Sequence, residues 1–314
     1  MFVIHNPTAG RRNTRKLWAV LDWLVNHGAP VKILETRHSG HATVLAREAV
    51  ASGADMVVAA GGDGTIAETV AGMIGGQARL GVIPLGTANV LAHEFGLPNH
   101  PRELATILSS PRSAPLWPGV MRSPTSTKLF VQMVGAGFDA HVVHNIDLHT
   151  KRRIGRGAYV LQTLRELQRY QFPDLTIRLD GVKHRAASVI VSKGRFYGGP
   201  YILAPDARPG ERGFTVALFR DGGPLSALRA GAALPQGRMG ALPGVSLLHA
   251  SHVEIGGPIG LPVQADGDPA GILPLSVYDA EGPILVAASP QAKYRRGEAV
   301  LFDSASTPQQ QAAQ

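Results

Sequence analysis

The chain has 314 residues, a net charge of +8 and no cysteine. Its length allows one large domain or two of ordinary size, and 44% hydrophobic residues can supply a sizeable core. The absence of cysteine excludes disulfides, thiolate catalysis and thiolate metal sites. No run of about 18 apolar residues and no signal-peptide pattern is visible, so we expect a cytoplasmic protein.

Strand and helix patterns alternate over the first third of the chain. The sequence predicts strands at 2–5, 31–35, 56–60 and 80–84, and helices at 13–27, 42–51, 66–73, 87–95 and 102–109. The run 56–60 is continuously apolar, as in a strand buried on both faces. This alternation predicts a parallel, doubly wound α/β sheet.

Prolines at 111, 115 and 118 then interrupt the pattern and indicate a domain boundary. Beyond them, short apolar runs separated by glycine and proline turns predict an antiparallel sandwich or open barrel. These runs lie at 129–134, 175–179, 188–192, 214–219, 252–255 and 283–287, with one helix at about 157–170. We therefore assign domains to 1–118 and 119–303, with a disordered tail at 304–314; the last segment before the tail can pack back on the first domain.

The strongest chemical signal is the run Gly61-Gly62-Asp63-Gly64-Thr65, between a buried strand and a helix. Glycines let the backbone approach a phosphate closely, and the free N–H groups of the following helix attract an anion. Asp63 would repel phosphate unless a cation lies beside it, and nucleotide-bound Mg²⁺ would supply that cation. By itself, however, such a turn is more often an ordinary glycine turn.

Two further loops strengthen the interpretation. Asn6-Pro7-Thr8-Ala9-Gly10 and Pro84-Leu85-Gly86-Thr87-Ala88-Asn89 each follow a predicted strand. Carboxyl ends of parallel strands meet at one edge of a sheet, where open α/β sheets bind ligands. Neither the dinucleotide fingerprint nor the P-loop pattern occurs.

Together these segments resemble the diacylglycerol kinase catalytic domain, in the branch of bacterial soluble lipid kinases, which is also similar to sphingosine and ceramide kinases. The resemblance spans nearly the whole chain. The GGDGT run is shared with NAD kinases and phosphofructokinases, whereas the run from Pro84 to Asn89 is more specific to lipid kinases. Downstream, Tyr197-Gly198-Gly199 and Ala204-Pro205-Asp206-Ala207 resemble the second domain of that family.

The resemblance implies a Rossmann-like nucleotide domain followed by a β-sandwich, with the active site in the cleft between them. It implies an ATP-dependent kinase of a lipid hydroxyl. Ala9 stands where the family usually has serine. The residues expected to contact ATP are Asn6, Pro7, Thr8, Ala9, Gly10, Thr36, Gly61, Gly62, Asp63, Gly64, Thr65, Ile66, Ala67, Glu68, Gly86, Thr87 and Asn89.

Two carboxylates flank a glycine at Asp266-Gly267-Asp268. Phosphoryl transfer needs a group to orient or deprotonate the attacking hydroxyl. Spacing alone favours a plain acidic turn, because Asp-Gly is common in hairpins. The family has a glutamate, regarded as the base, where this chain has Asp268, whose reach is shorter by about 1.5 Å, roughly one bond length. We assign Asp268 as the base, with Asp266 supporting it.

Metal sites are not predicted in the protein beyond the Mg²⁺ bound with ATP near Asp63. Bacterial relatives often hold a structural Mg²⁺ through an aspartate that precedes a glycine, and Arg212-Gly213 stands at that place; the neighbouring Glu211 could substitute. His141, His144 and His149 lack the ligand pattern of a zinc site.

The basic balance favours anionic partners. Basic residues cluster at 11–16, 151–156 and 293–296, and each cluster taken alone is more often solvated surface. We expect reversible, electrostatic association with an anionic membrane through Lys151, Arg152, Arg153 and Arg156. No nucleic-acid module is found, and a homodimer is possible.

Other functions stay open on the sequence alone. A NAD kinase or another kinase of a soluble substrate is one alternative, and a non-catalytic nucleotide- or lipid-binding regulator is another. Among lipids, the sequence does not discriminate between diacylglycerol, monoacylglycerol, ceramide, sphingoid bases and phosphatidylglycerol.

Overall fold

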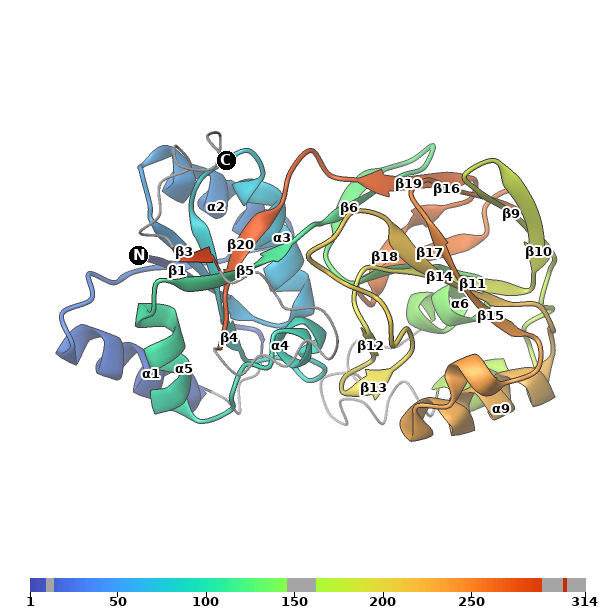
Figure 1. Ribbon diagram of the computed structural model, residues 1–314, viewed down its shortest axis with the longest axis horizontal. Coiled ribbons are helices and arrows are strands. Elements are labelled where there is room, and N and C mark those ends of the chain that lie inside the picture. Colours follow the sequence, from blue (N-terminus) through green and yellow to red (C-terminus); the bar gives the residue numbers. More distant parts are fainter. Residues whose placement is uncertain (10–13, 146–161, 290–301, 304–314) are drawn as a thin grey trace, which may run out of the picture. The chain divides into compact units, whose positions relative to one another are not determined.

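The computed structural model describes residues 1–9, 14–145, 162–289 and 302–303. Gly10, the cluster 151–156, the first part of the helix predicted at 157–170, and the tail 304–314 lie outside these residues. The chain divides into two units. The first comprises Met1–Leu116 with Glu281–Gln314, and the second comprises Trp117–Ala280 (Figure 1).

The first unit is built on a seven-stranded sheet in the order β2-β1-β3-β4-β20-β5-β21. The pairs from β2 to β20 are parallel, whereas β5 pairs antiparallel with both β20 and β21. Its strands are β1 (Phe2–His5), β2 (Lys32–Glu35), β3 (Met56–Gly61), β4 (Arg79–Pro84), β5 (Arg112–Leu116), β20 (Ile284–Ala287) and β21 (Phe302–Asp303). Its helices are α1 (Thr14–Asn26), α2 (His41–Ala51), α3 (Asp63–Met73), α4 (Val90–Glu94) and α5 (Pro101–Ser109).

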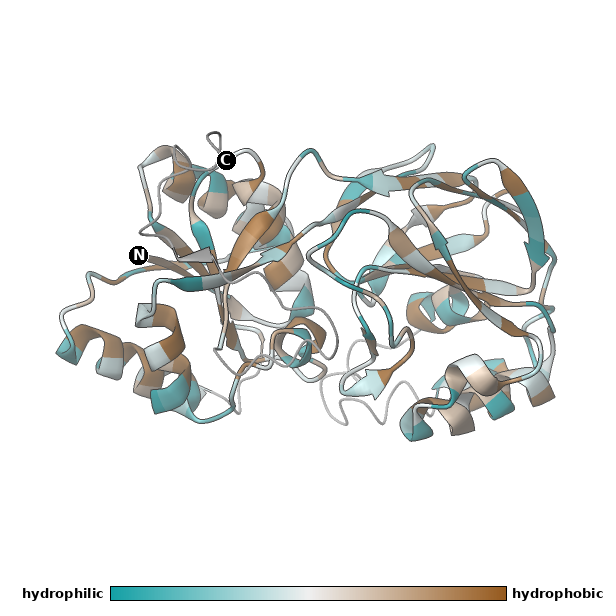
Figure 2. Ribbon diagram, in the orientation of Figure 1, coloured by the Kyte–Doolittle hydropathy of each residue, from teal (hydrophilic) through white to brown (hydrophobic). Residues whose placement is uncertain are grey.

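Burial explains why these elements form. β3 is buried along its whole length because helices pack on the sheet, as its apolar run predicted. Leu17, Val20, Leu21 and Leu24 place one buried stripe on α1, which packs on the sheet and α5. Figure 2 shows the same concentration of hydrophobic residues on β20.

The second unit is a sandwich of two six-stranded antiparallel sheets, in the orders β10-β9-β16-β19-β6-β7 and β15-β14-β11-β8-β17-β18. One apolar core is drawn from both sheets. The first sheet contains β6 (Gly119–Arg122), β7 (Thr127–Phe130), β9 (Leu175–Leu179), β10 (Val182–Ala186), β16 (Val253–Gly256) and β19 (Leu275–Asp279). The second contains β8 (Met133–Ala136), β11 (Ser188–Ser192), β14 (Phe214–Phe219), β15 (Val245–Ala250), β17 (Pro262–Ala265) and β18 (Asp268–Ile272).

Shorter elements complete the second unit. They are the hairpin β12 (Phe196–Tyr197) and β13 (Tyr201–Ile202), the helices α6 (Phe138–His144) and α9 (Pro224–Ala233), and the 3-10 turns η2 (Leu234–Gln236) and η3 (Met239–Ala241). No helix in the described part of the chain is long and apolar enough to span a membrane.

The fold differs from the sequence-based expectation in two places. The apolar run predicted as one strand at 129–134 is divided between β7 and β8, because the chain turns at Val131 and Gln132 and passes from one sheet to the other. The range assigned to the second domain extended to 303, with its last segment able to pack back on the first domain; β20 and β21 do so and complete the first sheet. A run of four apolar residues carries no information about which strands it joins, so the pairing with β4 and β5 could not be read from it.

Candidate active site

Three loops of the first unit meet because their strands are neighbours in the sheet. β1 pairs with β3, and β3 with β4, all in parallel, and the registers place His5 opposite Ala60 and Gly61 opposite Pro84. The three strands therefore end together at one edge. The loops that begin at Asn6, Gly62 and Leu85 lie at that edge, which is where α/β sheets bind ligands.

Asn6 fastens the first loop to the glycine turn. Its Nδ2 donates to Thr65 Oγ1 at 3.1 Å, and its Oδ1 accepts from the backbone N–H and hydroxyl of Thr8 at 3.0 and 2.8 Å. Both ends of the amide are used, so the Asn6 side chain is fixed. Pro7 and Thr8 are exposed at the tip of the loop, and Ala9 is half-buried.

The glycine turn approaches the third loop so closely that no side chain would fit at Gly86. A Cβ there would lie 2.7 Å from the Cα of Gly62. Asp63 begins α3, and its Oδ1 accepts from the backbone N–H of Val90 at 2.7 Å. The Asp63 carboxylate thus joins the second and third loops.

Asn89, on the loop after β4, has a side-chain amide oxygen that is not used in the contacts between the loops. Its backbone is left-handed, with φ of 49°, and its Nδ2 donates to the carbonyl of Gly86 at 2.9 Å. Its Oδ1 is buried and has no hydrogen-bond partner among the residues that the structure describes. Amide oxygens and carboxylates are ligand types that Mg²⁺ accepts, so the chemistry of Asp63 and Asn89 fits an ion brought by a nucleotide.

Two of the residues expected to contact ATP have structural tasks. Ile66 is fully buried, so its side chain belongs to the core. The Glu68 carboxylate accepts from the backbone N–H groups of Gly40 and Ala42, at 2.8 and 3.3 Å, and so caps α2. Thr36 is half-buried and its backbone N–H donates to the carbonyl of His5 at 2.8 Å, which places it at the end of β2 beside the first loop.

Lys16 is a further candidate site residue, which the sequence analysis assigned to a solvated basic cluster. Its Nζ donates to the carbonyl of Pro84 at 3.3 Å, at the end of β4. Burial lowers the pKa of Lys16. The helical pattern that places Leu17 and Val20 inward also places Lys16 beside the sheet edge. The position of Lys16 around this helix was the feature of the sequence that could have identified it.

In the second unit, Asp266 and Asp268 lie in different surroundings although one glycine separates them. The Asp266 carboxylate accepts from the backbone N–H groups of Val131, Gln132 and Met133 at 2.8, 2.8 and 2.9 Å. It therefore holds the turn between β7 and β8. Asp268 begins β18 and is exposed. Of the two carboxylates, Asp268 is therefore the candidate for contact with a substrate.

A buried network supports this turn. Gln264 accepts from the backbone N–H of Gly267 at 2.9 Å and donates to Asp139 Oδ2 at 2.9 Å. The Tyr197 hydroxyl donates to the other oxygen of Asp139. Burial raises the pKa of Asp139, although both hydrogen bonds oppose that shift. Asp139, Tyr197 and Gln264 thus fix the backbone next to Asp268, and sequence reasoning did not single out Asp139 or Gln264.

The loop 208–214 is held by a lysine. Lys193 Nζ donates to Asp279 Oδ1 at 2.5 Å and to the carbonyls of Glu211 and Gly213 at 3.2 and 2.9 Å. Asp279 also accepts from the backbone N–H of Gly213 at 2.8 Å, and its other neighbour is the largely exposed Arg212. Burial lowers the pKa of Lys193, against the effect of Asp279. An ammonium group thus lies among the oxygens of the loop that, by the family resemblance, corresponds to the structural Mg²⁺ loop of bacterial relatives.

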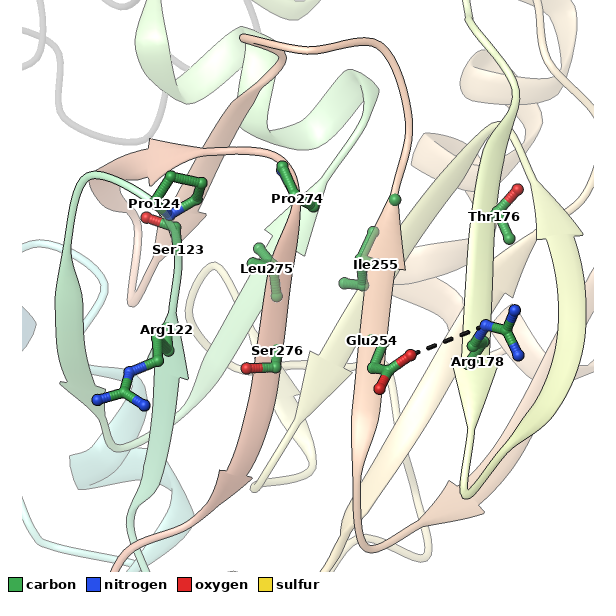
Figure 3. A pocket seen from close by; sticks show the side chains of 11 residues that line it. Arg122, Ser123, Pro124, Thr176, Arg178, Glu254, Ile255, Pro274, Leu275 and Ser276 are labelled. Atoms are coloured by element: carbon green, nitrogen blue, oxygen red, sulfur yellow. Dashed lines mark ion pairs between the residues drawn. The ribbon is translucent and has the colours of Figure 1, made fainter.

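The histidine and the pocket described next are not part of this candidate site. His141 Nε2 lies 2.8 Å from the buried Glu166 carboxylate. No group of three metal-ligating side chains occurs within 1–9, 14–145, 162–289 and 302–303. An open pocket of about 520 Å³ lies on the sheet of β6, β19, β16 and β9. Figure 3 draws the side chains that line it, among them Arg178 and Glu254, whose charged groups are 3.8 Å apart. None of the candidate residues lines it.

Comparison with known proteins agrees with this architecture. Residues 1–116 match the model of the diacylglycerol kinase catalytic domain, and residues 132–292 match the YegS C-terminal NAD kinase beta sandwich-like domain. A solved diacylglycerol kinase from Bacillus anthracis str. Sterne superposes with a TM-score of 0.68 at 19% identity, over 93% of this chain and 97% of that chain.

Curated relatives cover most of the chain as well. A diacylglycerol kinase of Bacillus subtilis is 26% identical over 283 residues, which is 87% of this chain and 90% of the relative. A protein of Pseudomonas aeruginosa (strain UCBPP-PA14) named "Probable lipid kinase YegS-like" is 30% identical over 217 residues, 66% of this chain and 68% of the relative.

The two units, an α/β domain followed by an antiparallel β-sandwich, follow the order of the two matched family models. The chain belongs to the diacylglycerol kinase-like lipid kinase family, with a diacylglycerol kinase catalytic domain followed by a YegS-type C-terminal domain.

Proposed function

We propose that the protein transfers the γ-phosphate of ATP to the hydroxyl group of a lipid. The observation that carries this proposal is the joining of the loops after β1, β3 and β4 by the Asn6–Thr65 and Asp63–Val90 hydrogen bonds. Such a fixed edge, rich in backbone N–H groups, suits the phosphates of a nucleotide. Relatives named for lipid kinase activity support a lipid acceptor.

On the nucleotide side, the backbone of residues 61–65 and 86–89 would receive the phosphates. Thr8 and Thr87 are suited to further contacts because both are exposed on these loops. Asp63 and Asn89 would hold a Mg²⁺ ion delivered with ATP. Such an ion neutralises phosphate charge as phosphoryl transfer proceeds.

On the acceptor side, Asp268 would accept the hydroxyl proton. The lipid oxygen forms a bond to the γ-phosphorus while the bond from that phosphorus to the bridging oxygen breaks, and ADP leaves. Asp266 would take no part in the proton transfer, because three backbone N–H groups already occupy its oxygens. Its support for Asp268 would be structural.

The test is ATP turnover with candidate acceptors, comparing wild type with Asp268→Asn. Label from the γ-phosphate should enter a lipid product, and the variant should lose most of the transfer. A second candidate follows from the C-terminal model, whose description refers to NAD kinase. Phosphorylation of NAD rather than lipid, under the same conditions, would favour that alternative.

A further inference from the structure

In helix α9 the large apolar side chains face away from the protein, which is the reverse of the usual arrangement in a surface helix. At 100° per residue, Leu225, Leu228 and Ala232 fall on one face. That face is outward, with the two leucines 60% and 48% exposed. The opposite side carries Ala230, which packs against an apolar cluster, and Ala233, which is buried. Small residues therefore face the protein and large apolar residues face away.

Packing within the second unit does not account for this arrangement. A helix on a globular surface normally turns its large apolar side chains toward the core. Figure 1 shows α9 at the periphery of the second unit, outside both sheets. The exposed leucines are therefore available to an apolar phase outside the protein.

The two charged side chains of residues 222–253 are both positive. Arg229 lies on α9 itself and Arg238 follows η2, and both are exposed. The two arginines line a hollow of about 470 Å³ with Ala232 and Leu242. Neither forms an ion pair with the described residues. No aspartate or glutamate occurs between Asp221, which precedes α9, and Glu254.

We propose that the outer face of α9, with Arg229 and Arg238, docks the protein on an anionic phospholipid membrane. This rests on the proposed function, because a lipid substrate lies in a bilayer. Leucines that enter the boundary between headgroups and acyl chains, flanked by cations at the anionic headgroups, are the features of an interfacial helix.

A second copy of the chain fits this face less well. A ten-residue helix is about 15 Å long, so its outer face offers on the order of 150–200 Å². A stable protein interface buries about 800 Å² on each partner. Reversible membrane docking has no such requirement, because each leucine and each arginine contributes separately.

The test is co-sedimentation with vesicles of phosphatidylcholine alone or with 30% phosphatidylglycerol, at low and high salt. Leu225→Ser with Leu228→Ser should weaken binding roughly tenfold or more, since buried apolar area is lost. Arg229→Gln with Arg238→Gln should weaken binding to anionic vesicles roughly 30-fold at low salt, and less at high salt.

Matched controls lie elsewhere in the second unit. Val182 and Ile259 are 61% and 92% exposed, and their double change to serine removes similar apolar surface. Lys183→Gln with Arg185→Gln removes two exposed charges from β10. Both controls should bind vesicles as wild type does. Docking by α9 is overturned if the α9 variants bind normally, if the controls lose binding equally, or if wild type does not bind.

Two further measurements distinguish membrane docking from the proposed kinase activity and from dimerisation. Phosphorylation of lipid dispersed in detergent micelles tests the proposed function without a bilayer, and the α9 variants should retain it. Unchanged vesicle binding by the variants overturns the docking proposal whatever the micelle assay gives. Analytical ultracentrifugation should find the same mass for wild type and the leucine variant; a dimer that this variant dissociates would assign the face to a second copy instead.

Discussion

Asp266→Asn should destabilise the second unit rather than act directly on the chemistry. The Asp266 carboxylate accepts three backbone N–H groups, and Asn would present an NH₂ group to at least one of them. Hydrogen bonds to a charged group contribute about 1.5–3 kcal/mol each, and the three share one side chain, so we expect a loss of about 3–5 kcal/mol.

Urea unfolding followed by circular dichroism measures that loss, and amide hydrogen exchange at Val131, Gln132 and Met133 locates it. In wild type these amides should be protected, and in Asp266→Asn they should exchange much faster. Asp268→Asn is the matched control, because Asp268 is exposed and its change should cost less than about 0.5 kcal/mol. A stable Asp266→Asn protein with protected amides and no turnover would refute this reasoning and assign the base to Asp266.

Four further outcomes are expected. Asp63→Ala should abolish phosphoryl transfer in a folded protein, and near-normal turnover would remove Asp63 from the mechanism. Asp268→Asn should lower kcat by about 10²–10⁴-fold with little change in KM for ATP, as expected for loss of a general base; a change confined to KM would contradict that role. Lys193→Met should lower the unfolding free energy by about 3–5 kcal/mol, since it removes the buried cation paired with Asp279 and leaves only the largely exposed Arg212 beside that carboxylate. Millimolar Mg²⁺ should barely change the thermal midpoint of the nucleotide-free wild type, and strong Mg²⁺ stabilisation would indicate a metal in this loop. Burial raises the pKa of Asp139, so the native state binds the carboxyl proton more tightly than the unfolded chain does. The free energy of unfolding should therefore fall as pH rises from about 3.9 toward the raised pKa. In Asp139→Asn this decline, measured as the urea midpoint, should vanish; a decline that persists would belong to another group.

Much of the first unit could be predicted because its signals are local. The continuous apolar run of β3 and the glycines after it fix a buried strand, a turn and a helix within residues 56–73. The meeting of three loops at one edge then follows from parallel pairing. The sequence could not show which loop side chains are already engaged, because Glu68 is fixed by α2 and Asp63 by Val90, contacts that depend on tertiary packing.

The second unit was predicted as a class and not in detail. Its short strands alternate between two sheets, so adjacent runs such as β7 and β8 belong to different layers. The partners of Asp266 are more than 130 positions away in the sequence, and Lys193 and Asp279 are 86 apart. No spacing rule connects residues at such separations, so the structural role of Asp266 emerged only from the fold.

The most direct test of the central claim follows the γ-phosphate of radiolabelled ATP over a panel of lipids, with the products separated by chromatography. The account predicts a labelled lipid phosphate from at least one lipid with a free hydroxyl, and almost none from Asp63→Ala or Asp268→Asn. Label found only in a water-soluble product such as phosphorylated NAD, or lipid labelling that both variants retain, would contradict it.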